Sequence, residues 1–246
     1  MSNSCFILVD FDNFIPKDFT VDTIDRVLRD VVNDIIRSGE EIDLIRIRLY
    51  GGWYQSYRIT NRASLVASML SMINHFPLYS GLNKIDGEIE LASTLINDDT
   101  VWGETYEEKD GIPKIVIKSE FGEACERHGA NCPLKVLQNL TKKASRRCEM
   151  DGCEIVHKEA IKRMGQKCVD SIIVCDIISL SEMDDCSWIV LLSDDKDLHP
   201  AFLASREKRE SKRTDYYMTN HQRFDAYRGF LESFNVNCHL YEHSAI

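Results

Sequence analysis

Aspartates at the boundaries of apolar runs, in three separated stretches, are the feature that most limits what this chain can fold into. Residues 6–9 lead into Asp10, residues 189–192 lead into Ser193 and Asp194, and Asp170 follows Val169 at the start of another apolar stretch. Apolar runs without alternation are typical of parallel strands buried on both faces, and open α/β sheets bind ligands outside the carboxyl ends of such strands. The sequence therefore predicts buried strands whose acidic ends meet at one crevice.

The rest of the chain alternates predicted strands with predicted helices. Helical spacing of apolar residues covers 21–35, 62–76, 169–180, 198–208 and 222–232, and strand patterns cover 5–9, 42–50, 154–163, 188–192, 214–218 and 238–241. Repeated strand–helix units predict an α/β fold with a mostly parallel central sheet, flanked by helices on both faces. With 246 residues and 43% hydrophobic content, we expect a single domain over residues 1–246.

The segment 83–157 breaks this alternation and is predicted to be an insertion within the domain. Strand-like pieces at 88–96 and 113–118 flank an acidic loop. The segment also carries Cys125, Cys132, Cys148 and Cys153. Two pairs of thiolates suit a tetrahedral structural Zn²⁺, with His128 or His157 as a replacement for one cysteine. Unliganded thiols and redox chemistry are the alternatives.

Composition excludes several classes of protein. The longest apolar runs, 172–175 and 189–192, are far shorter than the roughly 18 residues of a membrane helix, so no membrane partner is expected. The stretch 5–9 meets Asp10 too soon for a secretory signal, and nine cysteines fit a reducing compartment, which together predict a cytoplasmic protein. A net charge of −10 argues against coating duplex nucleic acid by bulk electrostatics, without excluding a nuclease.

Taken together, the separated aspartates predict a divalent-metal site. Any one of them is explained as a helix cap or a turn residue, but acids at three separate element ends are hard to explain as independent caps. Asp197 shares a side with Asp194 if a helix starts there, whereas Asp176 falls on a different helix face from Asp170. Carboxylate oxygens are the hard ligands that Mg²⁺ and Mn²⁺ prefer, and a cation relieves the repulsion among them.

Aromatic and basic residues follow the strand predicted at 42–50. Trp53 and its neighbouring tyrosines can stack on the bases of single-stranded nucleic acid, and Arg58 and Arg62 can meet phosphates. The alternative is a buried aromatic corner in which the adjacent glycines form a tight turn. The residues therefore give two interpretations of this segment.

Three motifs stand in an order and spacing that resemble a known nuclease family. They are Leu-Val-Asp-Phe-Asp-Asn at 8–13, Lys-Cys-Val-Asp-Ser-Ile-Ile-Val-Cys-Asp at 167–176 and Leu-Ser-Asp-Asp-Lys-Asp-Leu-His-Pro at 192–200. Together they resemble the motifs of NYN domains, a branch of the PIN-like nucleases. The resemblance covers both ends of the chain and leaves 83–157 uncovered.

This resemblance implies a PIN-like fold and a Mg²⁺- or Mn²⁺-dependent nuclease, with RNA, single-stranded in particular, as the favoured partner. The metal carboxylates and catalytic residues would be Asp10, Asp170, Asp194 and Asp197. Asn13 and Ser193 would be polar neighbours that orient a carboxylate or touch phosphate. The family usually has glycine at the positions of Cys168 and Asp195, so the acid at 195 either alters the number of metals or points to solvent. A homo-oligomer or a larger assembly stays open.

Two other functions also stay open. Asp10-Phe11-Asp12 after a strand and the late stretch 193–197 resemble motifs of haloacid-dehalogenase-type phosphatases, in which Asp10 would be the nucleophile. Against this interpretation, Phe14 stands where that family has Thr or Val, and no convincing phosphate-binding strand end lies between the motifs. The second is a non-catalytic nucleic-acid-binding module of PIN-like fold. The sequence motifs of nucleotide hydrolases, zinc proteases and serine hydrolases are absent.

Overall fold

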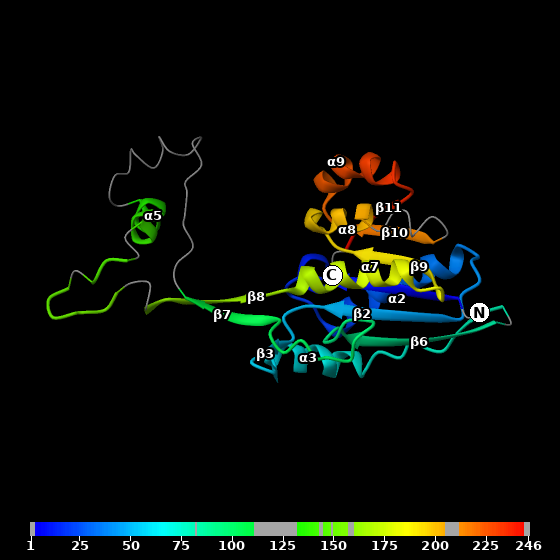
Figure 1. The fold of residues 1–246 in the computed structure, drawn as a ribbon, viewed down its shortest axis with the longest axis horizontal. Coiled ribbons are helices and arrows are strands. Elements are labelled where there is room, and N and C mark those ends of the chain that lie inside the picture. Colours follow the sequence, from blue (N-terminus) through cyan, green and yellow to red (C-terminus); the bar gives the residue numbers. More distant parts are fainter. Residues whose placement is uncertain are drawn as a thin grey trace. The chain divides into compact units, whose positions relative to one another are not determined.

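The computed structural model of the chain describes residues 3–81, 83–110, 132–142, 145–148, 150–156, 160–204 and 212–243. The chain forms two compact units, one made of Met1–Tyr106 with Gln166–Ile246 and the other of Glu107–Gly165. The larger unit contains the central sheet (Figure 1). All of the aspartates predicted to form a site also belong to this unit.

A seven-stranded sheet forms the centre of the larger unit, in the order β11-β10-β9-β1-β2-β6-β5. Its strands are β1 Ser4–Asp10, β2 Leu44–Tyr50, β5 Leu78–Ser80, β6 Asn83–Leu91, β9 Cys186–Leu192, β10 Arg213–Met218 and β11 Asn237–Leu240. Every pairing is parallel except that of the edge strand β5 with β6. The predicted α/β class with a mostly parallel sheet is therefore confirmed.

Helices and one short hairpin connect these strands. The helices are α1 Phe11–Phe14, α2 Val21–Arg37, α3 Asn61–Leu70, α7 Val169–Glu182, the 3₁₀ helix η2 Lys196–Leu198, α8 His199–Ala204 and α9 His221–Glu232. The hairpin, β3 Tyr54–Gln55 with β4 Arg58–Ile59, follows β2. α2 begins with a capping box between Thr20 and Thr23, which satisfies two backbone donors at its start. None of the helices in the described ranges is long and apolar enough to cross a membrane.

β1 lies between β2 and β9, and all of its residues are buried. Ile7 and Val9 belong to a hydrophobic core shared with α2, whereas Leu8 belongs to a second core shared with α7. Because successive side chains of a strand point to opposite faces, β1 is packed on both sides. This packing explains why its sequence is apolar throughout instead of alternating with polar residues.

The predicted start of the insertion at residue 83 is wrong. Residues 83–91 are β6, which pairs in parallel with β2 and belongs to the central sheet. Only Ile85 of this strand is buried, because β6 has only the short β5 beyond it and so lies near the edge of the sheet. Its exposed charged residues interrupt the apolar run that is typical of a buried strand, so the sequence pattern does not indicate it. The smaller unit begins at Glu107.

Two further element boundaries were predicted incorrectly. The helix expected over 62–76 ends at Leu70, and Met72, which follows it, is 71% exposed. The strand expected over 154–163 is instead β8, Lys162–Gln166.

The smaller unit contains α5, Pro133–Lys142, and an antiparallel bridge between Arg147 and Val156. β7, Tyr106–Asp110, pairs with β8 in a two-stranded sheet where the chain enters and leaves this unit. The strand-like piece predicted at 113–118 lies outside the described residues.

A buried carboxylate links α7 to β2 and to the segment after β6. Asp176 is 0% exposed; its Oδ2 accepts a 2.6 Å hydrogen bond from Tyr50 Oη, and its Oδ1 accepts a 2.9 Å bond from the Ile96 backbone N–H. Arg48 Nε lies 3.6 Å from the same carboxylate. Burial raises the pKa of Asp176, and these three partners oppose the shift. The group thereby fixes α7, whose first turn contains Asp170, against the carboxyl end of β2.

Replacing Asp176 with alanine should therefore destabilise the protein by about 2–4 kcal/mol, because the Tyr50 hydroxyl and the Ile96 amide would lose their buried acceptor. Urea denaturation measures this change in the free energy of unfolding. Asp184→Ala is the matched control, since Asp184 is an exposed acid just after the same helix, and it should leave stability nearly unchanged. Equal losses in the two variants would contradict the structural role of Asp176.

Candidate metal centre

The parallel register brings the ends of β1, β2 and β9 to one edge of the sheet. Asp10 pairs with Tyr50, the last residue of β2, and Val9 pairs with Leu192, the last residue of β9. In Figure 1, β2 and β9 run in the same direction. Ser193 follows Leu192 directly, so β1 and β9 bring Asp10 and Ser193 to neighbouring positions at the carboxyl edge.

Asp10 is a carboxylate in an almost closed environment. Its exposed fraction is 0%, and its Oδ2 accepts hydrogen bonds from Ser193 Oγ at 2.6 Å and from Asn13 Nδ2 at 2.9 Å. Its Oδ1 is also buried but has no hydrogen-bond partner among the described residues. A buried carboxylate oxygen without a partner costs free energy unless a proton or a cation meets it.

Four carboxylates act on one another electrostatically at this edge. Burial raises the pKa of Asp10 from its ordinary 3.8 to about 6; the bonds from Ser193 and Asn13 oppose this, and the charges of Asp170 and Asp195 add to it. Burial also raises the pKa of Asp170, with further contributions from Asp195 and Asp197. The group therefore contains Asp10 from β1, Asp170 from the first turn of α7, and two acids from the segment after β9. We call it the acid cluster.

Ser193 joins two members of the acid cluster. Its hydroxyl donates to Asp10 and accepts a 2.9 Å hydrogen bond from the backbone N–H of Asp195. The Asp195 carboxylate in turn accepts a 2.9 Å bond from the backbone N–H of Asp197, which caps the short helix η2. Ser193 was predicted to orient a carboxylate or to touch phosphate, and in the structure its hydroxyl is hydrogen-bonded to the Asp10 carboxylate.

Asp194, predicted as a metal ligand, uses its carboxylate elsewhere. Its Oδ1 accepts hydrogen bonds from the backbone N–H groups of Thr219 at 2.9 Å and Asn220 at 3.0 Å, and its Oδ2 accepts one from the Thr219 hydroxyl. These bonds hold the turn between β10 and α9. The acid whose charge acts on Asp10 is the next residue, Asp195. The sequence shows the adjacent pair Asp194 and Asp195, but only the path of the backbone decides which of the two side chains belongs to the acid cluster.

The side chains of the acid cluster do not form a complete set of protein ligands for a metal ion. Within the described part of the chain, no three His, Cys, Asp or Glu side chains are placed to hold one metal ion together. Mg²⁺ commonly takes only one or two protein carboxylates and fills its remaining positions with water and substrate oxygens. The oxygen donors of the cluster and the unpartnered Asp10 Oδ1 fit such a hard cation.

The residues predicted to contact substrate differ in their accessibility. Trp53 is fully buried, and its indole N–H donates a 2.7 Å hydrogen bond to a backbone carbonyl of β2, so it forms an aromatic corner and presents no face for stacking. Arg62 forms an ion pair with Asp12, and its guanidinium lies 5.3 Å from the centre of the Phe11 ring. Arg58 is exposed on the hairpin.

The cysteines predicted to bind zinc are only partly described. Cys125 lies outside the described residues, as do both histidines considered as replacements. Cys132 is buried. Cys148 and Cys153 are half-buried on either side of a turn, which is closed by a 2.7 Å hydrogen bond from the Cys148 N–H to the Ile155 carbonyl. A zinc site at these residues stays a prediction.

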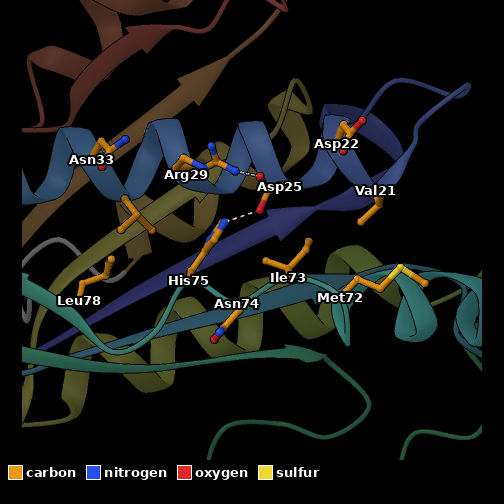
Figure 2. Close-up of a pocket in the computed structure, with 11 residues that line it drawn as sticks. Val21, Asp22, Asp25, Arg29, Asn33, Met72, Ile73, Asn74, His75 and Leu78 are labelled. Carbon is orange, nitrogen blue, oxygen red and sulfur yellow. Dashed lines mark hydrogen bonds and ion pairs between the residues drawn. The ribbon is translucent and has the colours of Figure 1, made fainter.

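A cavity of about 580 Å³ lies between α2 and residues 72–78, and Figure 2 shows the side chains that line it. Its carboxylate Asp25 is 2.6 Å from His75 Nε2 and forms an ion pair with Arg29. Burial lowers the pKa of His75, and the Arg29 charge adds to this effect. Asp25 therefore already has two partners, and the buried polar atom without one among the described lining residues is His75 Nδ1, a ring nitrogen and not a carboxylate oxygen.

Comparisons of the chain with protein-family models, with curated proteins and with solved structures give no match. A functional assignment therefore depends on the residues and their geometry.

Neutralising Asp10 should stabilise the protein at neutral pH. Its raised pKa means that the folded state binds a proton more tightly than the unfolded chain does, so the charged form begins to cost stability above about pH 4 and costs the full amount above about pH 6. The rise of the Asp10 pKa from 3.8 to about 6 corresponds to on the order of 2–3 kcal/mol of lost stability at neutral pH. With chelator present, Asp10→Asn should gain this amount at about pH 7.5, and the gain should vanish below about pH 4, where the wild-type group is protonated in both states.

Asp194→Ala should change stability in the opposite direction. It removes the acceptor that holds Thr219 and Asn220, and it should cost about 1–3 kcal/mol at neutral pH. Urea unfolding of both variants across this pH range measures the two effects. A loss of stability in Asp10→Asn at neutral pH, or a gain that persists unchanged in acid, would contradict a charged and buried Asp10.

Proposed function

We propose that the protein is a nuclease of the PIN-like, NYN type that hydrolyses phosphodiester bonds with the help of Mg²⁺ or Mn²⁺, and that single-stranded RNA is its favoured substrate. The observation that carries the proposal is the buried Asp10 carboxylate at the end of the central strand, with one oxygen unpartnered and with the charges of Asp170 and Asp195 acting on it. Nine cysteines fit a reducing compartment, so we assign this activity to the cytoplasm.

The acid cluster supports a hydrolysis in which water is the nucleophile. Bound at Asp10 with help from Asp170, Asp195 or Asp197, Mg²⁺ or Mn²⁺ would supply charge neutralisation at the phosphate and a lowered pKa for water. Ser193 and Asn13 hold the second oxygen of Asp10, which keeps the carboxylate in one orientation. We assign to the exposed Asp197 the role of accepting a hydrogen bond from the attacking water.

The backbone at Cys168 supports the resemblance to NYN domains. Its φ of 60° lies in the left-handed region, which favours glycine, and glycine is the residue that this family usually has there. Cys168 is the N-cap residue of α7, so this turn leads directly into the helix that carries Asp170. This turn can therefore accommodate either glycine or cysteine at position 168. The cysteine costs about 1–2 kcal/mol of stability because of its left-handed backbone conformation.

A phosphatase that uses Asp10 as its nucleophile has less support. Such an enzyme must bring a carboxylate oxygen of Asp10 to the phosphorus atom of its substrate. The Asp10 side chain is 0% exposed, and its Oδ2 already accepts hydrogen bonds from Ser193 and Asn13. A buried oxygen of this kind is better suited to a small cation than to a tetrahedral phosphoryl group.

Incubation of the protein with labelled single- and double-stranded RNA and DNA tests the proposal. Cleavage of single-stranded RNA should require Mn²⁺ or Mg²⁺ and stop with chelator, and Asp10→Asn should lower the rate at least about 100-fold because the central ligand is lost. Asp195→Asn should lower it more than Asp194→Asn, since the Asp195 charge is the one that acts on Asp10.

Asp184→Asn is the control for this experiment, because Asp184 is exposed and precedes β9 instead of following it. It should retain full activity. Trapping of a phosphoaspartate at Asp10 would contradict the nuclease proposal and support the phosphatase alternative. Binding of RNA without any metal-dependent cleavage would indicate a non-catalytic module of the same fold.

We further propose that the smaller unit holds a structural zinc ion through Cys125, Cys132, Cys148 and Cys153. The turn that brings Cys148 and Cys153 near one another supports one pair of this set. Elemental analysis of the purified protein should find about one zinc per chain, lost in Cys148→Ser/Cys153→Ser and retained in Asp10→Asn. Protein without zinc, or zinc that survives the double substitution, would rule out this site.

A further inference from the structure

A second cleft adjoins the end of β2 and has not been assigned a role. Its volume is about 730 Å³, and one of its walls is the β3–β4 hairpin. Its lining includes Gly52, Gln55, Arg58, Asn61, Arg62 and Tyr106. We call it the hairpin cleft. All of these residues belong to the larger unit.

Hydrogen bonds on two sides hold the hairpin in place. Thr60, directly after β4, donates its N–H to the Trp53 carbonyl at 2.8 Å and its hydroxyl to the Gly52 carbonyl at 3.0 Å. Tyr54 in β3 donates its N–H to the Thr105 hydroxyl at 2.9 Å and accepts a 3.0 Å bond from the Thr105 N–H. The cleft is therefore formed before any ligand arrives, which lowers the entropic cost of binding.

The charge of the hairpin cleft is positive in a chain whose net charge is −10. The charged residues that line it are Arg58 and Arg62. Arg58 is exposed and forms no ion pair with any residue that the structure describes. Arg62 is paired with Asp12 but its side chain is still 38% exposed. Two guanidinium groups in one cleft favour a phosphate group as ligand.

The cleft also has an aromatic wall. The Tyr106 ring lies against the backbone of Gly52, so closely that a Cβ atom at residue 52 would come within 2.7 Å of its Cδ2 atom. The side-chain amides of Gln55 and Asn61 line the same cleft and can hydrogen-bond the edge of a base. A phosphate contact, a flat ring and two amides together match a nucleotide.

Arg62 connects the hairpin cleft to the acid cluster. Its ion-pair partner Asp12 is in α1, the short helix that begins directly after Asp10. Arg62 also lies over the ring of Phe11, the first residue of that helix. A strand of nucleic acid with one phosphate at Arg62 would therefore place a neighbouring nucleotide close to the end of β1.

We propose that the hairpin cleft binds one nucleotide of a single-stranded nucleic acid beside the bond to be cut, with Arg58 and Arg62 on its phosphate and Tyr106 stacked on its base. The inference rests on the proposed nuclease function and names the part of the site that selects the substrate. A single strand is required because the bases of a duplex are already stacked and paired, so that none is available to Tyr106.

Binding of a fluorescent oligonucleotide of about 12 nucleotides, followed by anisotropy with chelator present, tests the inference separately from cleavage. Arg58→Ala should weaken binding of single-stranded RNA at least about fivefold and reduce the slope of log affinity against log salt concentration by about 0.7, the value for one lost phosphate contact. Arg37→Ala is the matched control, because this arginine is 76% exposed at the end of α2 and away from the cleft. It should change affinity less than about twofold.

Substitutions of Tyr106 test the stacking contact. Tyr106→Ala should weaken binding and abolish the quenching of a 2-aminopurine base placed in the oligonucleotide, whereas Tyr106→Phe should preserve both because it keeps the ring. The thermal unfolding midpoint of each variant shows that the fold is intact. The same binding measurement is made with a DNA oligonucleotide of the same sequence, and with the RNA duplex and the DNA duplex.

Equal binding by Arg58→Ala and Arg37→Ala would overturn the inference, and so would duplexes that bind as tightly as single strands. Competition by a phosphopeptide as strong as that of the oligonucleotide would also overturn it, because the cleft would then recognise phosphate on a protein. Single-strand binding that depends on Arg58 and Tyr106, without any metal-dependent cleavage by the wild-type protein, would refute the nuclease and leave the nucleotide subsite standing.

Discussion

The parallel pairing of β1 with β2 and β9 is the constraint on which the rest of this structure depends. β1 is hydrogen-bonded along both edges and packed on both faces, so its last residue is buried together with the apolar residues before it. That residue is Asp10, and water cannot solvate its charge there. Its pKa is raised to about 6 as a result, and one of its oxygens has no partner among the described residues. The proposed metal site follows from this buried charge.

Asp194 and Asp195, the two adjacent acids after β9, have different roles because their side chains have different partners. Asp194 accepts three hydrogen bonds from the turn before α9 and so holds β10 and α9 to the end of β9. The charge of Asp195 instead acts on Asp10 and Asp170, and its backbone is tied to Ser193. One strand end thereby contributes both a structural carboxylate and a member of the acid cluster.

A net charge of −10 is compatible with a nucleic-acid substrate when the positive charges that contact the substrate are concentrated near the proposed site. Burying carboxylates at the strand ends concentrates negative charge where a divalent cation would neutralise it. Arg58 and Arg62 then supply positive charge in the hairpin cleft, next to α1. Such a surface fits the proposed binding of a short single strand better than that of a duplex bound along a broad basic face.

The sequence by itself determined the α/β class and the acidic strand ends, because strands buried on both faces must be apolar and their ends are visible where the acids begin. It did not show β6, whose charged residues near the sheet edge resemble a loop, and it could not tell a stacking Trp53 from a buried one. Only the tertiary structure decided that Asp195, and not Asp194, acts on Asp10. The physical reason is that neighbouring side chains at a strand end diverge, and the packing of β10 and α9 selects which of them turns toward β1.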